Sequence, residues 1–232
     1  MTNHRASSIL PVLIAGVLCF GLSGCRSSEN THDLFSSDSD SPDTSGAVKI
    51  SKMGGDIDVK EAPHGADLST MGGNIHLGDV ASFAKFKTMG GVIAIDHAKG
   101  SVEAATMGGE VNIDHAEGAV KASTMGGDIS ARIVGTSTEE RDVELTSQGG
   151  TVTLTVPKDF PMDVRITLAY TKNAPRTYEI IDHIGLEQRE SSDWEMSFGA
   201  PRKYIRAMGH VGTGLNHVVI KTTNGDVILK QE

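Results

Sequence analysis

The chain has 232 residues, 38% of them hydrophobic, which allows one domain or one repeat array with a capping segment. Its formal net charge of −9 makes nucleic acid and anionic lipid surfaces poor partners. The two cysteines, Cys19 and Cys25, both lie near the N-terminus, so the rest of the chain has no disulfide and no reactive thiol.

Residues 1–24 have the organisation of a bacterial lipoprotein signal peptide. Arg5 precedes an apolar run from Ile9 to Leu22, too short to cross a hydrocarbon core of about 30 Å. The run ends in Leu22-Ser23-Gly24-Cys25, which resembles the lipobox of bacterial lipoproteins. This resemblance implies cleavage before Cys25, acylation of Cys25 and attachment to a membrane through the lipid. Arg26 after that residue implies the outer membrane of a bacterial cell envelope. The alternative is an ordinary secretory signal with an incidental cysteine.

Residues 25–47 are rich in serine and aspartate and contain almost no apolar side chains. Such a composition cannot bury a core, so it predicts a disordered tether. About twenty flexible residues reach roughly 25 Å, which would hold a folded body clear of lipid headgroups.

The tripeptide Met-Gly-Gly then occurs five times at steps of 18 residues. The copies begin at Met53, Met71, Met89, Met107 and Met125. A short strict period indicates a solenoid, whose coils stack on one another. We therefore expect an all-β, single-stranded, parallel β-helix-like solenoid of 18-residue coils in residues 48–135, with looser coils and a C-terminal cap in residues 136–232.

Each coil reads as two short alternating strands joined by the Gly-Gly pair, whose backbone angles a Cβ would resist. The inward columns of the first strand are Val48, Ala66, Ala84, Val102, Val120 and Ile50, Leu68, Phe86, Ala104, Ala122. Those of the second strand are Ile57, Ile75, Ile93, Val111, Ile129 and Val59, Leu77, Ile95, Ile113, Ala131. A third inward column is Ala62, Val80, Ala98, Ala116 and Val134.

A left-handed helix of hexapeptides, the architecture of many acyltransferases, is the alternative for an 18-residue coil. It needs an apolar residue every six positions. The positions six before the third inward column are Asp56, Asn74, Val92, Glu110 and Asp128, which are polar in four of five coils. The hexapeptide alternative therefore does not fit.

One outward column alternates in charge from coil to coil. Its members are Lys49, Asp67, Lys85, Glu103 and Lys121. Parallel strands about 4.8 Å apart would place each charge between two opposite ones, which favours one register.

Two later motifs resemble a known family. Thr124-Met125-Gly126-Gly127-Asp128-Ile129 and Thr222-Thr223-Asn224-Gly225-Asp226-Val227 resemble the Thr-Ser-Asn-Gly-Asp-Ile turn of a bacterial adhesin-like family of β-strand-repeat domains of unknown function. Ser147–Val152 is a looser copy. The resemblance extends from Val48 to the C-terminus and implies an extracytoplasmic β-solenoid. Lys172–Asn216, which contains Trp194, interrupts the repeat and is expected to cap the solenoid.

The methionine column is the first candidate binding surface. Strand alternation directs the preceding threonines inward and so turns Met71, Met89, Met107 and Met125 outward. Three interpretations stay open: the side chains fold back over the core edge, they contact a protein partner, or their thioethers ligate Cu(I).

A candidate metal site is formed by Asp96-His97 and Asp114-His115, which are one period apart. Imidazoles on adjacent rungs can share a metal ion. The alternative is a repeated solvent-facing turn without a ligand, since His64 and Asp79 replace the pair in earlier coils.

Catalytic signatures are weak. Gly209–Gly214 has the glycines of a phosphate loop but lacks the strand, turn and helix around it. We expect no enzyme activity and no cofactor. The expected function is that of a non-catalytic, lipid-anchored, adhesin-like binding or scaffold module with a protein or envelope-glycan partner. The alternative is a polysaccharide-binding or polysaccharide-active solenoid.

Overall fold

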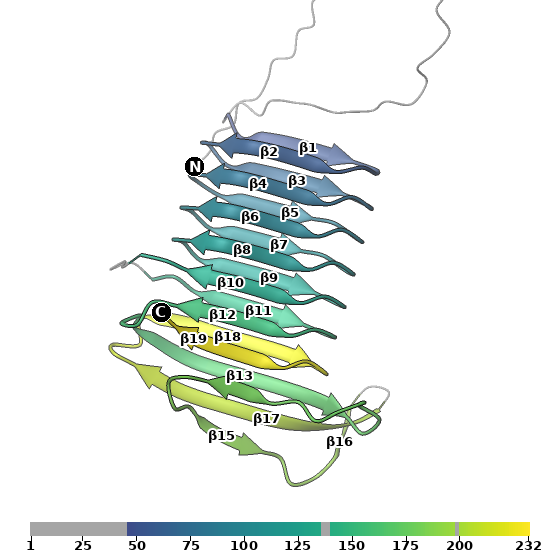
Figure 1. Cartoon of the computed structure of the whole chain (residues 1–232), viewed down its shortest axis with the longest axis vertical. Helices are drawn as coiled ribbons and strands as arrows, with labels where there is room; N and C mark the ends of the chain where they lie inside the picture. The colour runs from purple at the N-terminus through teal and green to yellow at the C-terminus, as the bar shows by residue number, and fades with distance from the viewer. Residues whose placement is uncertain (1–45, 136–139, 198–199) are drawn as a thin grey trace, which may run out of the picture. The chain divides into compact units, whose positions relative to one another are not determined.

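The computed structural model describes residues 46–135, 140–197 and 200–232, which form two β-sheets (Figure 1). One sheet has eleven strands and the other has eight, and no helix occurs in these ranges. None of the described residues therefore belongs to a helix that is long and apolar enough to span a membrane. The signal peptide, Cys25 and nearly all of the expected tether lie outside the described residues.

Each regular coil contributes one strand to each sheet. The strands in the eleven-stranded sheet are β1 (Val48–Lys52), β3 (Ala66–Thr70), β5 (Ala84–Lys87), β7 (Val102–Ala105), β9 (Val120–Thr124) and β11 (Val143–Ser147). Those in the eight-stranded sheet are β2 (Ile57–Ala62), β4 (Ile75–Val80), β6 (Ile93–Ala98), β8 (Val111–Ala116), β10 (Ile129–Ile133) and β12 (Val152–Val156). The remaining strands are β13 (Met162–Thr171), β14 (Ile180–Asp182), β15 (Glu187–Glu190), β16 (Glu195–Ser197), β17 (Ala200–Val211), β18 (Asn216–Thr223) and β19 (Val227–Gln231).

Successive coils stack in parallel register along both sheets. Val48 pairs with Ala66, and Ala66 with Ala84. On the other sheet Ile57 pairs with Ile75 in the same manner. The prediction of an all-β parallel solenoid with 18-residue coils is confirmed.

The two inward columns predicted for each strand of a coil form the core. From the second coil to the fifth every member is at most 2% exposed, as Leu68 and Leu77 illustrate. In the first coil Val48, Ile50 and Val59 are only partly buried, because no coil precedes them in the part of the chain that the structure describes. The alternation of the sequence thus reports which face of each strand is inside.

The third inward column departs from the prediction at its last member. Ala116 pairs with Ile133, not with Val134, because the register shifts between Ala131 and Ile133. Ile133 is accordingly 2% exposed, whereas Val134 is only half-buried. The cause is that β8 has two residues between its inward Ile113 and Ala116, whereas β10 has one between the equivalent positions.

The sixth coil follows the fifth after a longer connection. Its turn residue Thr151 donates its backbone N–H to the Asp128 carboxylate across 23 residues, where earlier coils use 18. The buried Arg141 fills the resulting corner and donates to the backbone oxygens of Glu117 and Val134. The backbone N–H of Arg141 donates to the side-chain oxygen of the buried Asn216, and this hydrogen bond joins the corner to β18.

The last strands in sequence do not lie at the end of the stack. β18 pairs with β11 on one side and β13 on the other, and β19 lies between β12 and β14. The Thr222–Val227 motif therefore forms the turn of a seventh coil, next to the sixth, as Figure 1 shows in yellow.

Beyond this coil the sheet becomes antiparallel. β17 pairs antiparallel with β13, and β15 and β16 pair antiparallel with β17. β15, at the outer edge, consists of exposed Glu187, Gln188, Arg189 and Glu190. Charged side chains on an edge strand discourage pairing with other chains.

A buried threonine joins each Met-Gly-Gly turn after the first to the turn before it. Thr106 donates its hydroxyl to the Gly91 carbonyl of the preceding coil at 3.1 Å and accepts the Gly109 N–H of its own turn at 3.2 Å. Thr88 and Thr124 repeat both contacts, as does Ser147 in the sixth coil. We call this pair of hydrogen bonds the threonine clamp. It is the role of the threonine that precedes the methionine in the second to fifth coils.

The two glycines of each turn have different roles. A Cβ on Gly109 would lie 1.8 Å from the Gly91 carbonyl oxygen, whereas a Cβ on Gly108 would approach only the Met89 carbonyl oxygen, at 3.7 Å. Of the glycine pairs in these turns, only Gly55 has a positive φ. The expectation that backbone angles require the pair is therefore wrong for the stacked coils, where close approach of neighbouring backbones requires the second glycine.

We expect Gly109→Ala to lower the free energy of unfolding by at least about 1–3 kcal/mol, since the added methyl forces two coils apart. Gly108→Ala is the matched control and should change it by no more than about 0.5 kcal/mol. Urea denaturation of both variants measures the difference. Equal losses would contradict the separate roles of the two glycines.

We expect Thr106→Val to cost about 1–3 kcal/mol, because it leaves the Gly109 N–H and the Gly91 carbonyl without their partner at a site from which water is excluded. Thr106→Ser keeps the hydroxyl and should lose clearly less. Thermal melts of both variants test the clamp, and a valine variant as stable as the serine variant would argue against it.

Candidate functional site

The turns between the two sheets present one methionine per coil to solvent. Met71, Met89, Met107 and Met125 are 49–51% exposed, and Met53 in the first coil is 81% exposed. The clamp explains this position, because the inward threonine directs the next side chain away from the core. The methionines are therefore not buried over the core edge, and about half of each side chain remains available for contact. We call these five residues the methionine edge.

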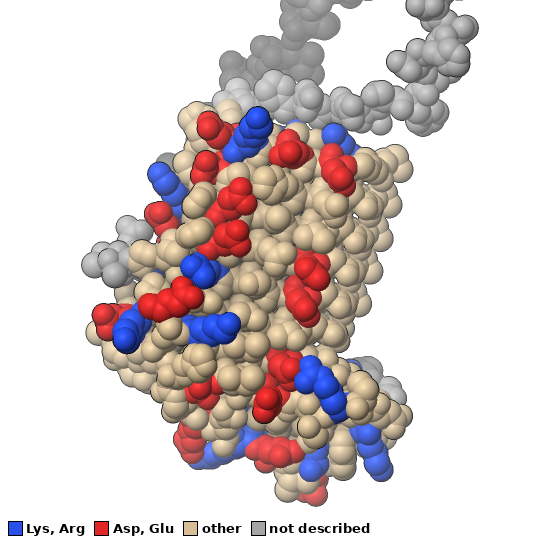
Figure 2. Space-filling model, in the orientation of Figure 1, with Lys and Arg blue, Asp and Glu red and all other residues tan. Residues whose placement is uncertain are grey.

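From the second coil onward, the methionines of the edge have no charged residue directly before or after them in the sequence. The two residues after each methionine are glycines in all five coils. In Figure 2 the right-hand margin of the middle coils, where Figure 1 shows these turns, is free of red and blue. The edge is thus an exposed apolar strip on a chain whose surface is otherwise rich in charge.

A polar column follows the glycines. The Asp56 carboxylate accepts the N–H of Asn74 at 2.7 Å, and the Asn74 side chain accepts the N–H of Val92 at 2.9 Å. Sequence reasoning used these positions only to exclude hexapeptides. The repeated Gly-Asp or Gly-Asn was nevertheless a usable signal, since aspartate and asparagine often bond to nearby backbone at turns.

The predicted metal ligands do not converge on one point. The rings of His97 and His115 stack with centroids 4.6 Å apart, but the Asp96 carboxylate lies 3.4 Å from Nε2 of His76. Asp114 is exposed. In the described ranges no group of three or more His, Cys, Asp or Glu side chains could hold a metal ion. The metal-site interpretation of Asp96, His97, Asp114 and His115 is therefore not supported.

Local strand geometry accounts for the Asp-His pairs. In β6 and in β8 two consecutive residues lie between the buried isoleucine and the buried alanine, so neither Asp nor His occupies an inward position. His76 instead forms the polar centre of this face, with Nδ1 3.1 Å from the Asp58 carboxylate. This hydrogen bond raises the pKa of His76.

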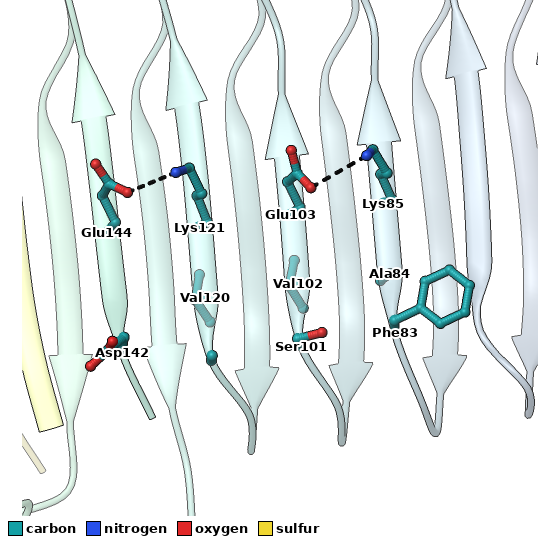
Figure 3. Close-up of a pocket in the computed structure, with 11 residues that line it drawn as sticks. Phe83, Ala84, Lys85, Ser101, Val102, Glu103, Val120, Lys121, Asp142 and Glu144 are labelled. Atoms are coloured by element: carbon teal, nitrogen blue, oxygen red, sulfur yellow. Dashed lines mark ion pairs between the residues drawn. The ribbon is translucent and has the colours of Figure 1, made fainter. Parts of the chain in front are cut away.

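The charge column is in register on the outer face of the larger sheet, as predicted. Lys49 pairs with Asp67, Asp67 with Lys85, Lys85 with Glu103, and Glu103 with Lys121. Figure 3 shows the two ion pairs, Lys85 to Glu103 at 3.6 Å and Lys121 to Glu144 at 2.9 Å. The hydrogen bond between Lys121 and Glu144 lowers the pKa of Glu144 and raises the pKa of Lys121. Sequence reasoning missed Glu144 because the longer connection breaks the period.

These charges flank an open groove of about 350 Å³ on the same face. Its floor includes the small residues Ser101 and Ala119, and Asp142 borders it at the sixth coil. In Figure 3 the Phe83 ring points away from Ser101, toward the N-terminal coils. Phe83, which is exposed, still lines the N-terminal end of the groove, so the groove offers charged, small and aromatic side chains.

We expect Glu103→Lys to lower Tm at low salt, because it places a third positive charge between Lys85 and Lys121. Raising the salt to about 1 M shortens the screening length to ~3 Å and should recover much of the loss. Glu103→Gln, which removes attraction without adding repulsion, should lose less. A Tm of Glu103→Lys that does not depend on salt would argue against the charge column.

Comparison with known proteins places the chain in a family. Residues 37–173 match the family model described as Toastrack DUF4097, and this range is more than half of the chain. No curated protein and no solved structure matches the chain. The match ends at residue 173, two residues into the interrupted segment, and so does not include the seventh coil, although the seventh coil continues the same stack. The chain belongs to the Toastrack DUF4097 family, whose domains have repeated β-structure and unknown function.

Proposed function

We propose that this protein is a lipid-anchored component of a bacterial cell envelope, a non-catalytic scaffold that binds a protein partner through the methionine edge. The anchor is Cys25, within the lipobox-like Leu22-Ser23-Gly24-Cys25, and the location is the outer membrane. The adhesin-like character suggested by the sequence resemblance belongs to this proposal as well.

The exposure of the methionine edge carries the proposal. Four of its methionines are half exposed to nearly the same extent, and the fifth is more exposed still. A row of flexible, polarizable side chains adapts to the shape of a protein surface more readily than branched ones. A contiguous apolar strip on a soluble surface is also a usual mark of a protein contact.

The repeat supports a binding function more than a catalytic one. Its outward columns present similar groups at many equal positions, as the charge column illustrates. General acid and base catalysis needs a few titratable groups whose environments differ. A surface of repeated positions suits contact with a long, flat partner surface.

The test is cross-linked affinity capture by the full lipidated chain from its own envelope. We expect one stoichiometric protein to be captured by the wild type and lost when Met71, Met89, Met107 and Met125 are all changed to Ser. A variant with the same four changed to Leu should retain it, because leucine keeps the apolar strip. The control is Met196→Ser with Met208→Ser, which changes exposed methionines elsewhere.

Capture of the same protein by the Ser variant would contradict docking at the methionine edge. A second candidate, binding of an envelope polysaccharide, is favoured by the charged groove between Lys85 and Asp142. Retention of the chain on peptidoglycan, abolished by Lys85→Ala with Lys121→Ala, would support that candidate in place of protein docking.

A further inference from the structure

The methionines of the edge are partly covered where another coil precedes them in the stack. Met53, before which the described residues form no coil, is 81% exposed, whereas Met71 is 50% exposed and Met125 is 51% exposed. The difference shows that each internal methionine is covered mainly by the preceding turn. Met125 is followed by Gln148 rather than by a methionine, yet its exposure does not differ from that of the others. Every methionine that has a coil before it is thus about half covered, whichever residue follows it in the next coil.

The backbone holds these side chains at a fixed repeat. Directly before the turns, the backbone N–H of Thr88 donates to the carbonyl oxygen of Ala105, and that of Thr106 donates to the carbonyl oxygen of Ser123, both at 3.0 Å. Within the turn, Gly108 donates its N–H to the Met89 carbonyl at 3.1 Å. Neighbouring methionines thus begin from backbones about 4.8 Å apart, the spacing of paired strands. Three rotatable bonds in each side chain allow adjacent sulfurs to approach one ion.

The surroundings leave the sulfurs accessible. The residue after each methionine is glycine, and a Cβ built on Gly72 or Gly90 would meet nothing within 4 Å. No side chain from the turn therefore covers the thioethers from this side. The glycines also contribute no carboxylate or imidazole that would favour a harder ion.

Thioethers are soft, uncharged ligands. They suit Cu(I) and the chemically similar Ag(I), and bind Zn²⁺, Mg²⁺ or Ca²⁺ poorly. Unlike thiolate or imidazole ligands, a thioether has no proton to lose before it binds, so its affinity should not fall at mildly acidic pH. In the described part of the chain no cluster of three or more His, Cys, Asp or Glu competes for such an ion.

We propose that the methionine edge binds a soft monovalent ion, Cu(I) or Ag(I), through thioethers of consecutive coils. The site goes beyond the proposed protein docking and uses the sulfur atoms, not only the apolar surface, of the same residues. Five methionines in a row provide for about one or two ions per chain, each held by about two or three sulfurs. No redox step is involved.

The experiment titrates the full chain, carrying Cys19→Ser and Cys25→Ser so that no thiol competes, with Ag(I) by calorimetry at pH 5 and pH 7. Cu(I) is titrated under reductant against a chromophoric chelator. We expect binding at both pH values. The affinity should fall by more than about tenfold when four methionines are changed to Leu, namely Met71, Met89, Met107 and Met125. A loss of about tenfold is already usual when a residue that only supports a metal ligand is removed.

Two controls make the result decisive. Met196→Leu with Met208→Leu removes exposed thioethers outside the edge and should leave binding unchanged. His97→Ala with His115→Ala tests the stacked imidazoles and should also leave it unchanged. Binding that survives in the four-leucine variant, or binding lost in either control, would overturn the proposal.

A measurement on the chain with its methionines intact covers the case in which the leucine variant does not fold. With methyl-labelled methionine, Ag(I) should shift the methyl resonances of the edge and not that of the buried Met162. Absence of such shifts at saturating Ag(I) would overturn the proposal. Because leucine keeps the apolar strip, loss of ion binding with retained partner capture separates this site from the proposed docking function.

Discussion

A buried hydroxyl held between two glycine backbones determines how this solenoid stacks. Each clamp threonine accepts from its own turn and donates to the turn before it, as Thr88 and Thr106 do. The bonds work only if the turns approach so closely that no Cβ fits at the second glycine. The same inward threonine sends the following methionine to the surface. The stacking contact and the exposed edge are therefore two results of one local constraint.

The repeated part of the fold was predictable because each coil meets the same neighbours. A column such as Ile75, Ile93 and Val111 reads as apolar in the sequence because it is buried in every coil. Alternation within a strand then predicts the exposed columns, including the methionines and the alternating charges. The different roles of Gly108 and Gly109 were not predictable, since the distinction arises only when one turn lies on another.

The remaining departures come from contacts that the period does not encode. Ile133 replaces Val134 in the core because β10 has one residue fewer than β8 between equivalent positions. Glu144 joins the charge column only after a longer connection has been accommodated. Asp96 contacts His76 of the preceding coil, so the residues that the spacing predicted as metal ligands do not converge on one point. In each case a neighbour from another strand decides the outcome.

The position of β18 and β19 has a consequence for the order of assembly. A chain synthesised from its N-terminus can add the first six coils one after another, because each needs only the coil already in place. The strands β13 and β14 instead wait for the last residues of the chain, because β18 lies between β11 and β13 and β19 lies between β12 and β14. Removing the C-terminal residues would thus open the interior of the array and expose strand edges on both sides of the gap.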